Sequence, residues 1–533
     1  MVKQLSFIRG SCSSSGCRRC FAYLASLVLL LVLSLTACAP GNQPADLQTL
    51  LSWPQDPALY LNAEAEDKSL MSQADQSSSA QVYLARHFLP WDAGKALYDS
   101  SRVFRDVENL KKAKLFGENL RPRPKDWITS LVRECNRQAY PSLDRKGVTV
   151  RSTNLRVLPT HRPGFLDPAK AGEGFPFDQL QYSSLWANTP VHVSHATADR
   201  SWYFVETAHV FGWAAAEDLA FVSDSLAQRF RSLPLAALTR DNVAVLDGSG
   251  QFLFQGRIGM LLPVLKAEDQ GLTCLALIPD QGRQAVTRTV ELKRASAASF
   301  PLSPTPRVCS RIAGEFLGQT YGWGGLFGNR DCSAFMRDFF APLGIWLPRN
   351  SAQQAGVGRL IDLENESVKD KERIIVDKGV PLLTMVTMPG HIMLYIGQRD
   401  GRALVQHAVW GLRTRDLLGR KGRLVIGQNV ITGLAPGKGV SNLDRPEGEL
   451  LHRITGMVLL DTGVTEWPSA PFRAAKGCAE NMDAISPDTA VADFSAISGF
   501  WSSVPEQAGT RAERHSRPAL EGPKRGVDFI QPD

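Results

Sequence analysis

The chain is poor in cysteine, with nine in 533 residues, and those beyond the N-terminal segment are scattered without close pairs. Their odd number predicts at least one free thiol and no disulfide framework, and no spacing among them suggests a zinc site. No basic run with interleaved aromatic residues is present, which argues against nucleic acid as a partner. We expect no metal and no other cofactor. The cysteines in question are Cys135, Cys274, Cys309, Cys332 and Cys478.

The composition is otherwise that of an ordinary globular protein. Hydrophobic residues make up 44% of the chain and charged residues 21%, which is enough core-forming material for several domains. The net charge is +7 and the pI is near 8.9. This mild basic bias suits the anionic surroundings of a membrane or a cell wall.

The N-terminus has the pattern of a secretory signal. Four basic residues precede an apolar run at residues 21–35, which is too short to span a bilayer comfortably. The run ends in Leu35-Thr36-Ala37-Cys38, which resembles a lipobox. In that interpretation Cys38 is acylated and becomes the first mature residue, so the protein is lipid-anchored to a bacterial membrane in the cell envelope, facing the periplasm or cell wall. An ordinary cleaved signal or a retained anchor helix are the alternatives.

The main candidate for chemistry is Cys332. A stretch rich in glycine and aromatic residues, 321–330, leads to this cysteine, and Phe335, Phe339 and Leu343 follow at the spacing of a buried helix face. Cys332 is therefore expected at a helix N-terminus, where unpaired amides and the helix dipole favour the thiolate. The alternative is a buried structural cysteine.

Two histidines downstream are candidate partners of that thiol. His391 follows a turn and opens an apolar run of strand length, and His407 lies in a second predicted strand at residues 403–411. Alternation places His391 on one face with Met393 and Tyr395, so that the ring can face a helix packed on the sheet. Paired beside it, His407 would orient the imidazole of His391. Each histidine taken alone is more often a core residue than a catalyst, but the chain order Cys, His, His, with both histidines at strand positions, favours catalysis.

These residues resemble the NlpC-type cysteine endopeptidases of bacterial cell walls, a papain-like family. Its hallmarks are an aromatic-Gly-Gly loop before Asp-Cys-Ser-Gly, a Gly-His opening a strand, and a polar residue, often His, on the next strand. The chain has Tyr-Gly-Trp-Gly-Gly, Asp-Cys-Ser-Ala, Gly-His and His407, and it departs at Ala334. The resemblance implies Cys332 as nucleophile and His391 as base. The backbone amide of Cys332 and the Tyr321 hydroxyl would stabilise the oxyanion.

The domain organisation follows from changes in pattern along the chain. We expect an α+β multidomain protein, in which a papain-like NlpC-type catalytic domain follows a small helical domain and two SH3-like β-barrels. The first barrel would carry a long insertion at residues 164–186. The predicted ranges are 1–37 signal peptide, 38–80 tether, 81–145 helical domain, 146–230 first barrel, 231–300 second barrel, 301–463 catalytic domain and 464–533 mostly disordered extension.

The resemblance implies hydrolysis of the γ-D-glutamyl to diamino acid bond of peptidoglycan stem peptides. In the two-barrel subgroup, residues around the nucleophile hold the free amine of an N-terminal L-Ala, so the enzyme should prefer free stem peptides to those attached to glycan. The corresponding residues here are Asp331, Ser333 and Ser351, with Glu173, Asp178 or Tyr182 offered by the first barrel. Asp331 is equally well explained as a helix cap.

Three other functions remain compatible with the sequence. The same fold and residues could serve a different thiol amidase or an acyltransferase. A non-catalytic wall-binding lipoprotein would use the barrels alone, although the presence of Cys332, His391 and His407 argues against it. A periplasmic structural scaffold has only the barrels in its favour.

Overall fold

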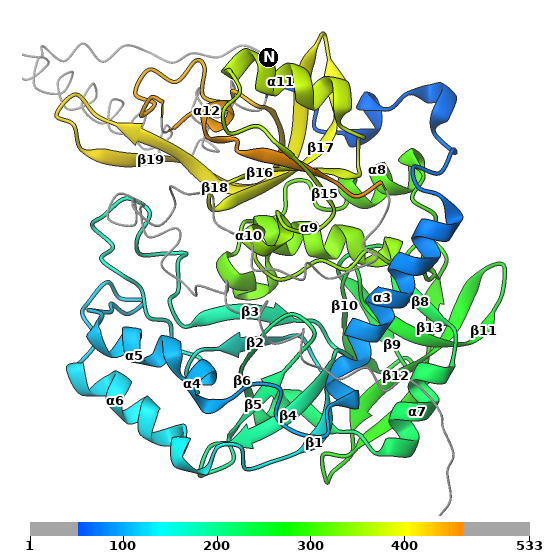
Figure 1. Ribbon diagram of the computed structural model, residues 1–533. Coiled ribbons are helices and arrows are strands. Elements are labelled where there is room, and N and C mark those ends of the chain that lie inside the picture. Colours follow the sequence, from blue (N-terminus) through cyan, green and yellow to red (C-terminus); the bar gives the residue numbers. More distant parts are fainter. Residues whose placement is uncertain (1–51, 447, 462–533) are drawn as a thin grey trace, which may run out of the picture.

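The computed structural model describes residues 52–446 and 448–461 (Figure 1). The predicted signal, Cys38, Cys478 and the predicted extension lie outside these ranges. Within them, a helical region is followed by two β-rich barrels and a mixed α and β domain, which confirms the fold class predicted from the sequence. None of the helices in the described ranges is long and apolar enough to cross a membrane.

The N-terminal region packs on the rest of the molecule from its first described residues. The sequence predicts a tether up to residue 80, but Trp53 and Tyr60 pack against the main core, and the Gln55 amide bonds the backbone of Ile431. The first long helix begins at Gln73, where the Ser72 hydroxyl caps it. The elements are η1 (Pro57–Tyr60), η2 (Ala63–Ala65), α3 (Gln73–Asp92), α4 (Ser100–Val103), α5 (Arg105–Lys112), α6 (Lys125–Glu134) and η3 (Arg137–Ala139).

The first barrel is a seven-stranded antiparallel sheet in the order β3-β2-β6-β5-β4-β1-β7. A long excursion between β2 and β3, residues 157–180, contains most of the insertion predicted at residues 164–186, but the last part of that predicted range forms β3 of the sheet. The elements are β1 (Arg145–Thr149), β2 (Thr153–Arg156), β3 (Gln181–Leu185), β4 (Pro190–Ala196), β5 (Trp202–Glu206), β6 (Phe211–Ala215), η4 (Ala216–Asp218) and β7 (Leu219–Phe221), and α7 (Asp224–Ser232) leads to the next barrel.

The second barrel combines a five-stranded sheet, in the order β13-β12-β11-β8-β14, with the hairpin β9-β10. It has its own apolar core. The strands are β8 (Leu235–Leu238), β9 (Val243–Leu246), β10 (Phe252–Gly256), β11 (Leu261–Ala267), β12 (Gly271–Pro279), β13 (Ala285–Lys293) and β14 (Ala297–Ser299).

The C-terminal domain is built on a six-stranded antiparallel sheet in the order β15-β20-β16-β17-β18-β19. Helices cover both faces, and α9 lies between this sheet and the two barrels (Figure 1). The elements are α8 (Pro306–Gly314), η5 (Trp323–Gly328), α9 (Cys332–Phe340), η6 (Ala341–Leu343), α10 (Ser351–Gln354), β15 (Arg359–Asp362), α11 (Val368–Lys378), β16 (Thr384–Met388), β17 (His391–Arg399), β18 (Arg402–Arg415), β19 (Lys421–Gly433), α12 (Leu450–Arg453) and β20 (Gly456–Leu459).

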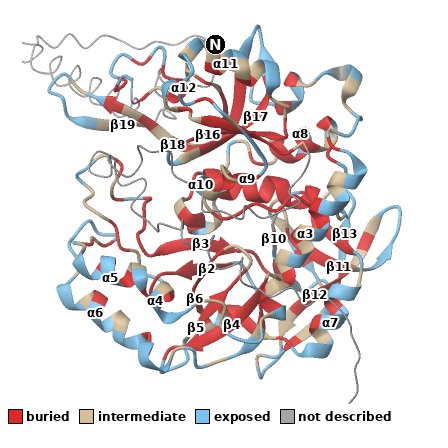
Figure 2. Cartoon of the chain, in the orientation of Figure 1, coloured by how far each residue is buried: buried red, intermediate tan, exposed pale blue. Residues whose placement is uncertain are grey.

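Helix α9 is the centre of the largest core. It begins at Cys332 because Asp331 adopts an extended conformation and its carboxylate accepts the backbone N–H of Ala334. Phe335 and Phe339 are fully buried on its inner side, as their spacing predicted. The whole helix is buried (Figure 2), which fixes the position of its first residue.

Candidate active site

Cys332 is the first residue of α9, as the sequence predicted, and it is only 8% exposed. Its thiol lies against the backbone N–H of Ile392, the residue that follows His391 at the start of β17. The fold therefore brings the N-terminus of α9 to the beginning of the strand that carries the predicted base. Helix α9 packs on both β17 and β18.

The two histidines lie on neighbouring antiparallel strands and contact each other. The distance from His391 Nε2 to His407 Nδ1 is 2.8 Å, and that from His407 Nε2 to the Thr432 hydroxyl is 3.1 Å. The pairing of β17 with β18 agrees with the prediction. Thr432, on β19, extends the chain of contacts by one residue, and only the register of β18 and β19 makes it a neighbour of His407.

One arrangement of protons fits this chain and leaves His391 able to act as a base. If His391 donates from Nε2 to His407, and His407 donates from its own Nε2 to the Thr432 oxygen, every contact has one donor and one acceptor. Nδ1 of His391 is then unprotonated and available to a thiol proton.

The faces of β17 differ from the arrangement expected from alternation. The face of β17 with Ile392, Leu394 and Ile396 packs in the core that contains α9, whereas Met393 and Tyr395 belong to the core beneath α11. The helix on the predicted histidine face is therefore α11 and not the nucleophile helix. Cys332 reaches this region because it lies at the end of its helix, beside the first residues of the strand.

The thiol and the imidazole are both neutral in this structure. Burial, together with the carboxylate of Asp331, raises the pKa of Cys332 to about 12, and the Ile392 amide only partly opposes this. Burial lowers the pKa of His391 to about 3 and that of His407 well below its usual range. The sequence predicted a thiolate favoured by the helix N-terminus, so the direction for Cys332 is corrected: desolvation outweighs the helix dipole here.

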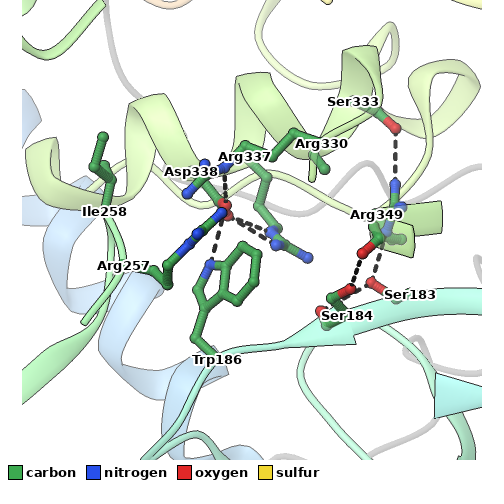
Figure 3. A network of polar contacts seen from close by, with 12 residues as sticks. Ser183, Ser184, Trp186, Arg257, Ile258, Arg330, Ser333, Arg337, Asp338 and Arg349 are labelled. Atoms are coloured by element: carbon green, nitrogen blue, oxygen red, sulfur yellow. Dashed lines mark hydrogen bonds and ion pairs between the residues drawn. The ribbon is translucent and has the colours of Figure 1, made fainter. Parts of the chain in front are cut away.

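Asp331 is paired with a buried arginine, Arg349, that the sequence did not single out. Figure 3 shows Arg349 between Ser183 and Ser333. Arg349 donates to the two carboxylate oxygens over 3.1 and 2.6 Å, to the Ser333 hydroxyl over 2.9 Å and to the Ser183 hydroxyl of β3 over 2.8 Å. The carboxylate also accepts the backbone N–H groups of Ala334 and Gly324. Burial alone would raise the pKa of Asp331, but Arg349 and these bonds hold it below its usual value.

This pairing changes the role predicted for Asp331. Its oxygens are fully used by the helix cap and by Arg349, so no open carboxylate oxygen faces a substrate amine, and the cap interpretation holds. The Ser333 hydroxyl is likewise engaged, donating to Asp331 while accepting from Arg349. Ser351, the first residue of α10, is half-buried close by in the chain.

The three candidate residues of the first barrel are engaged elsewhere. The Asp178 carboxylate lies 2.6 Å from the Arg156 guanidinium in a buried pair. The Tyr182 hydroxyl donates to Asp106, and the Glu173 carboxylate accepts the backbone N–H of Asp167. None of the three therefore presents an open acidic or phenolic group in this structure.

Strand β3 of the first barrel contacts the glycine-rich loop before the nucleophile. The Gln181 amide donates to the carbonyl of Gly324 over 3.0 Å, and the Ser184 hydroxyl donates to that of Gly325. Both glycines have positive φ, and a Cβ at Gly325 would lie 2.3 Å from the Ser184 oxygen. Only glycine permits so close an approach, so the glycines serve the junction between domains as well as the turn.

The insertion of the first barrel, between β2 and β3, also contacts the loop before the nucleophile through an aromatic side chain. Phe177 contacts the rings of Trp323 and Trp410, with centroid distances of 5.2 and 6.1 Å. Tyr321, the predicted oxyanion donor, is buried 6.0 Å from Trp410. These four side chains form an aromatic wall from three segments of the chain, and two of them, Tyr321 and Trp323, belong to the loop before Cys332.

Arg330, the residue before Asp331, is held by the second barrel directly and by the first barrel through a shared partner, Asp338. Arg330 donates to Asp338 on α9 over 2.7 Å and to Asp241 of the second barrel over 2.9 Å. The Trp186 indole, which follows β3, donates to Asp338 over 3.0 Å (Figure 3). The barrels therefore fix the segment that carries the nucleophile and are not loosely attached modules. In the described ranges, no group of three or more His, Cys, Asp or Glu side chains is arranged to hold a metal.

Comparison with protein families found four matches along the chain. Residues 25–140 match the N-terminal stabilising domain of NLPC_P60 proteins, and residues 163–215 match an SH3 domain of the SH3b1 type. Residues 223–269 match an SH3 domain of the SH3b2 type, and residues 318–416 match the NlpC/P60 family itself. The last match contains Cys332, His391 and His407. The comparison with curated proteins found no match.

The comparison with solved structures found one of similar fold over most of the chain, and others that are more remote. An NlpC/P60 endopeptidase from Photobacterium damselae subsp. piscicida shares 22% identity over 78% of this chain and 98% of its own, with a TM-score of 0.70. An NlpC/P60 family protein from Bacillus cereus (15% identity, 59% and 98% covered, TM-score 0.39) and NlpC2 from Trichomonas vaginalis (13%, 55% and 96%, 0.22) are more distant. The Photobacterium structure shares the arrangement of domains over most of the chain. That likeness shows the fold, and the four family matches, in their order along the chain, show that the chain belongs to the NlpC/P60 family, with a helical stabilising domain and two SH3-type barrels before the catalytic domain.

Proposed function

We propose that this protein is a cysteine endopeptidase that hydrolyses the γ-D-glutamyl to diamino acid bond of peptidoglycan stem peptides. The observation that carries the proposal is the thiol of Cys332 at the start of α9, beside the strand that begins with His391, together with the contacts from His391 through His407 to Thr432. The bond and the substrate come from the family likeness, and the contacts support thiol acyl transfer.

In the proposed mechanism, Nδ1 of His391 takes the proton of Cys332 as the sulfur attacks the carbonyl carbon of the D-glutamyl side chain. The imidazolium then protonates the amine of the diamino acid as the amide bond breaks, which leaves a thioester on Cys332. His391 next takes a proton from water as the water oxygen attacks the thioester. The C–S bond then breaks, the γ-carboxyl group is released, and the Cys332 thiolate takes the proton back from His391. His407 and Thr432 hold the ring of His391 through both steps.

The oxyanion formed in each step needs hydrogen-bond donors. The backbone N–H of Cys332 is suited to this because the first amides of a helix have no partner within the helix. Tyr321 is the proposed second donor, and its buried position in the aromatic wall supports this role.

A neutral thiol and imidazole at rest are compatible with this mechanism. Proton transfer between two buried groups creates an ion pair only when the substrate is present and its carbonyl begins to accept charge. The cost of forming that pair in a desolvated site is offset by the donors aimed at the oxyanion.

We further propose that free stem peptides, with an unlinked N-terminal L-Ala, are the preferred substrates. The direct contacts of β3 with Gly324 and Gly325 support this, because they close the nucleophile loop against the first barrel, and a glycan strand attached at that end of the substrate would need space there. The preference for a free N-terminus would be steric and not electrostatic, because the Asp331 carboxylate is already paired with Arg349.

The test is digestion of L-Ala-γ-D-Glu-diaminopimelate with the purified protein, followed by mass mapping of the products. The proposal predicts L-Ala-D-Glu and free diaminopimelate, and no products with Cys332→Ala. Release of L-Ala or transfer of an acyl group to an added amine would instead indicate another reaction of the same fold.

Anchoring to a membrane is a separate proposal, since it concerns residues outside the described ranges. Lipid on Cys38 would tether the enzyme to the cell envelope, where its substrate is found. Cys38→Ser should move the protein from the membrane fraction to the soluble fraction. Recovery of residues 21–35 in the mature chain would contradict cleavage before Cys38.

A further inference from the structure

The hairpin of β18 and β19 extends beyond the body of the catalytic domain (Figure 1). Two exposed leucines lie at its tip. Leu417 and Leu418 at its tip are 106% and 79% exposed, the highest values among the large apolar side chains described. Figure 2 shows the outer part of the hairpin as exposed. A soluble surface gains nothing from two adjacent leucines held fully in water.

The turn holds these leucines in a defined conformation. The Asp416 carboxylate accepts the backbone N–H groups of Leu418 and Arg420 over 2.9 and 2.8 Å, and the backbone N–H of Gly419 donates to the Asp416 carbonyl over 2.9 Å. Gly419 has a φ of +78°, which closes the turn without strain. The apolar tip is therefore a fixed feature of the fold.

One face of the hairpin carries cations directly opposite one another. Arg413 pairs across the strands with Arg423, and Arg415 pairs with Lys421. Side chains two residues apart point to the same face, so all four lie together. The Asp444 carboxylate bonds Arg415, and Asp416 bonds Arg420 next to the tip. Between residues 411 and 425 there are five basic residues and one acidic residue.

Like charges directly opposite each other destabilise a strand pair, so this arrangement has a cost in the isolated protein. An anionic partner offsets that cost, and two projecting leucines beside the cations fit the boundary between lipid headgroups and acyl chains. A soluble polyanion would use the cations and leave the leucines in water. We infer that this hairpin tip, residues 411–425, docks on the surface of an anionic lipid bilayer.

Docking of the hairpin tip on a bilayer would fix the distance between the active site and the membrane surface. His407 lies on the same strand, ten residues before Leu417, so an extended strand places it roughly 30 Å from the tip. The described chain begins near the base of the same hairpin, where Gln55 bonds Ile431 of β19. The fourteen residues from Cys38 to residue 52 can span up to roughly 50 Å. A lipid on Cys38 and the hairpin tip can therefore reach one bilayer surface, although the docking inference does not depend on that lipid.

The test uses a fluorophore whose emission reports water exposure, attached at Leu418→Cys of the full chain. In that chain Cys332 is replaced by Ala, and the cysteines outside the described ranges, Cys38 and Cys478 among them, are replaced by Ser. The native cysteines of the described ranges are buried, and Cys332→Ala removes the one at the candidate site. The probes are vesicles of phosphatidylcholine with and without phosphatidylglycerol. The matched control carries the label at Phe252→Cys, an exposed apolar position on the second barrel.

Anionic vesicles should shift the emission at position 418 to the blue, with a weaker shift on neutral vesicles and none at position 252. Lys421→Glu should raise the lipid concentration required by roughly fivefold or more, and unlabelled Leu417→Ser should weaken flotation with vesicles by roughly tenfold. Equal responses at the two labelled positions would overturn the inference. The inference would also be overturned if the protein bound polyglutamate while the label stayed in water, and the label did not respond to vesicles. The hairpin would then recognise a soluble polyanion.

Discussion

Replacing Arg349 by glutamine should loosen the beginning of α9 without touching the thiol or the histidines. In the structure the guanidinium makes two bonds to the Asp331 carboxylate, and the two side chains are only 6% and 9% exposed. The variant leaves that carboxylate buried without a cation. Removing one partner of a buried pair typically costs about 3–5 kcal/mol.

The local consequence can be followed at the amide that Asp331 caps. The backbone N–H of Ala334 bonds the carboxylate over 2.8 Å, so its hydrogen exchange reports opening of the first turn. A loss of about 3–5 kcal/mol corresponds to exchange that is roughly a hundredfold to several thousandfold faster. The assay is hydrogen–deuterium exchange with mass analysis of peptides that cover α9.

The control is Arg231→Gln, which removes an ion pair with Asp92 whose side chains are 34% and 50% exposed. Loss of such a surface pair should change stability by less than about 1 kcal/mol and leave exchange in α9 unchanged.

The destabilisation caused by Arg349→Gln should also depend on pH, and its direction follows from the pKa of Asp331. Burial alone would raise the pKa of Asp331, but Arg349 and the hydrogen bonds hold it below its usual value. Such a carboxyl adds stability above its unfolded pKa, near 3.9, and this is lost as the pH falls through the folded value. The gap between wild type and Arg349→Gln should therefore narrow below about pH 4. An exchange rate at pH 7 that is less than tenfold faster in Arg349→Gln than in wild type would refute the assigned role of the pair. So would a difference in exchange rate that grows in acid.

Other predictions concern the reaction itself. His391→Ala should lower kcat/KM by roughly three orders of magnitude or more and His407→Ala by less, while Thr432→Val, which keeps the shape but removes the hydroxyl, should cost roughly tenfold or less; equal losses at all three would contradict the proposed order of roles. Because the pKa of His391 is lowered to about 3, the acid limb of kcat/KM should lie well below pH 6, and a limb near pH 6.5 would indicate a solvated imidazole. Replacing the N-terminal L-Ala of the substrate by propionyl, which removes only the ammonium, should change the rate by less than about fivefold, whereas an essential charged bond would cost about 2–5 kcal/mol.

Much of the fold could be predicted because the local patterns agreed with the tertiary structure. The spacing of Phe335 and Phe339 marks the buried side of α9, and a glycine-rich run ending in Asp331 marks its start. His391 and His407 stand in apolar runs of strand length, and the two strands pair as predicted.

The features that the sequence did not reveal depend on contacts between distant segments. Arg349 looks like any arginine of a loop until Ser183 and Asp331 are brought beside it from other parts of the chain. Thr432 acquires a role only through the register of β18 with β19. The pKa of Cys332 was expected to fall at a helix N-terminus and instead rises, because the folded chain buries the thiol and places the Asp331 carboxylate beside it.

The most direct test of the central claim is to trap the nucleophile with a substrate analogue in which a chloromethyl ketone replaces the scissile amide of L-Ala-γ-D-Glu-diaminopimelate. Peptide mapping should find the label on Cys332 and not on Cys135 or Cys274, which are fully buried in other apolar cores. His391→Ala should slow labelling by roughly two orders of magnitude or more, because the thiol then has no proton acceptor. Labelling at another residue, or an unchanged rate in His391→Ala, would contradict the thiol and imidazole mechanism.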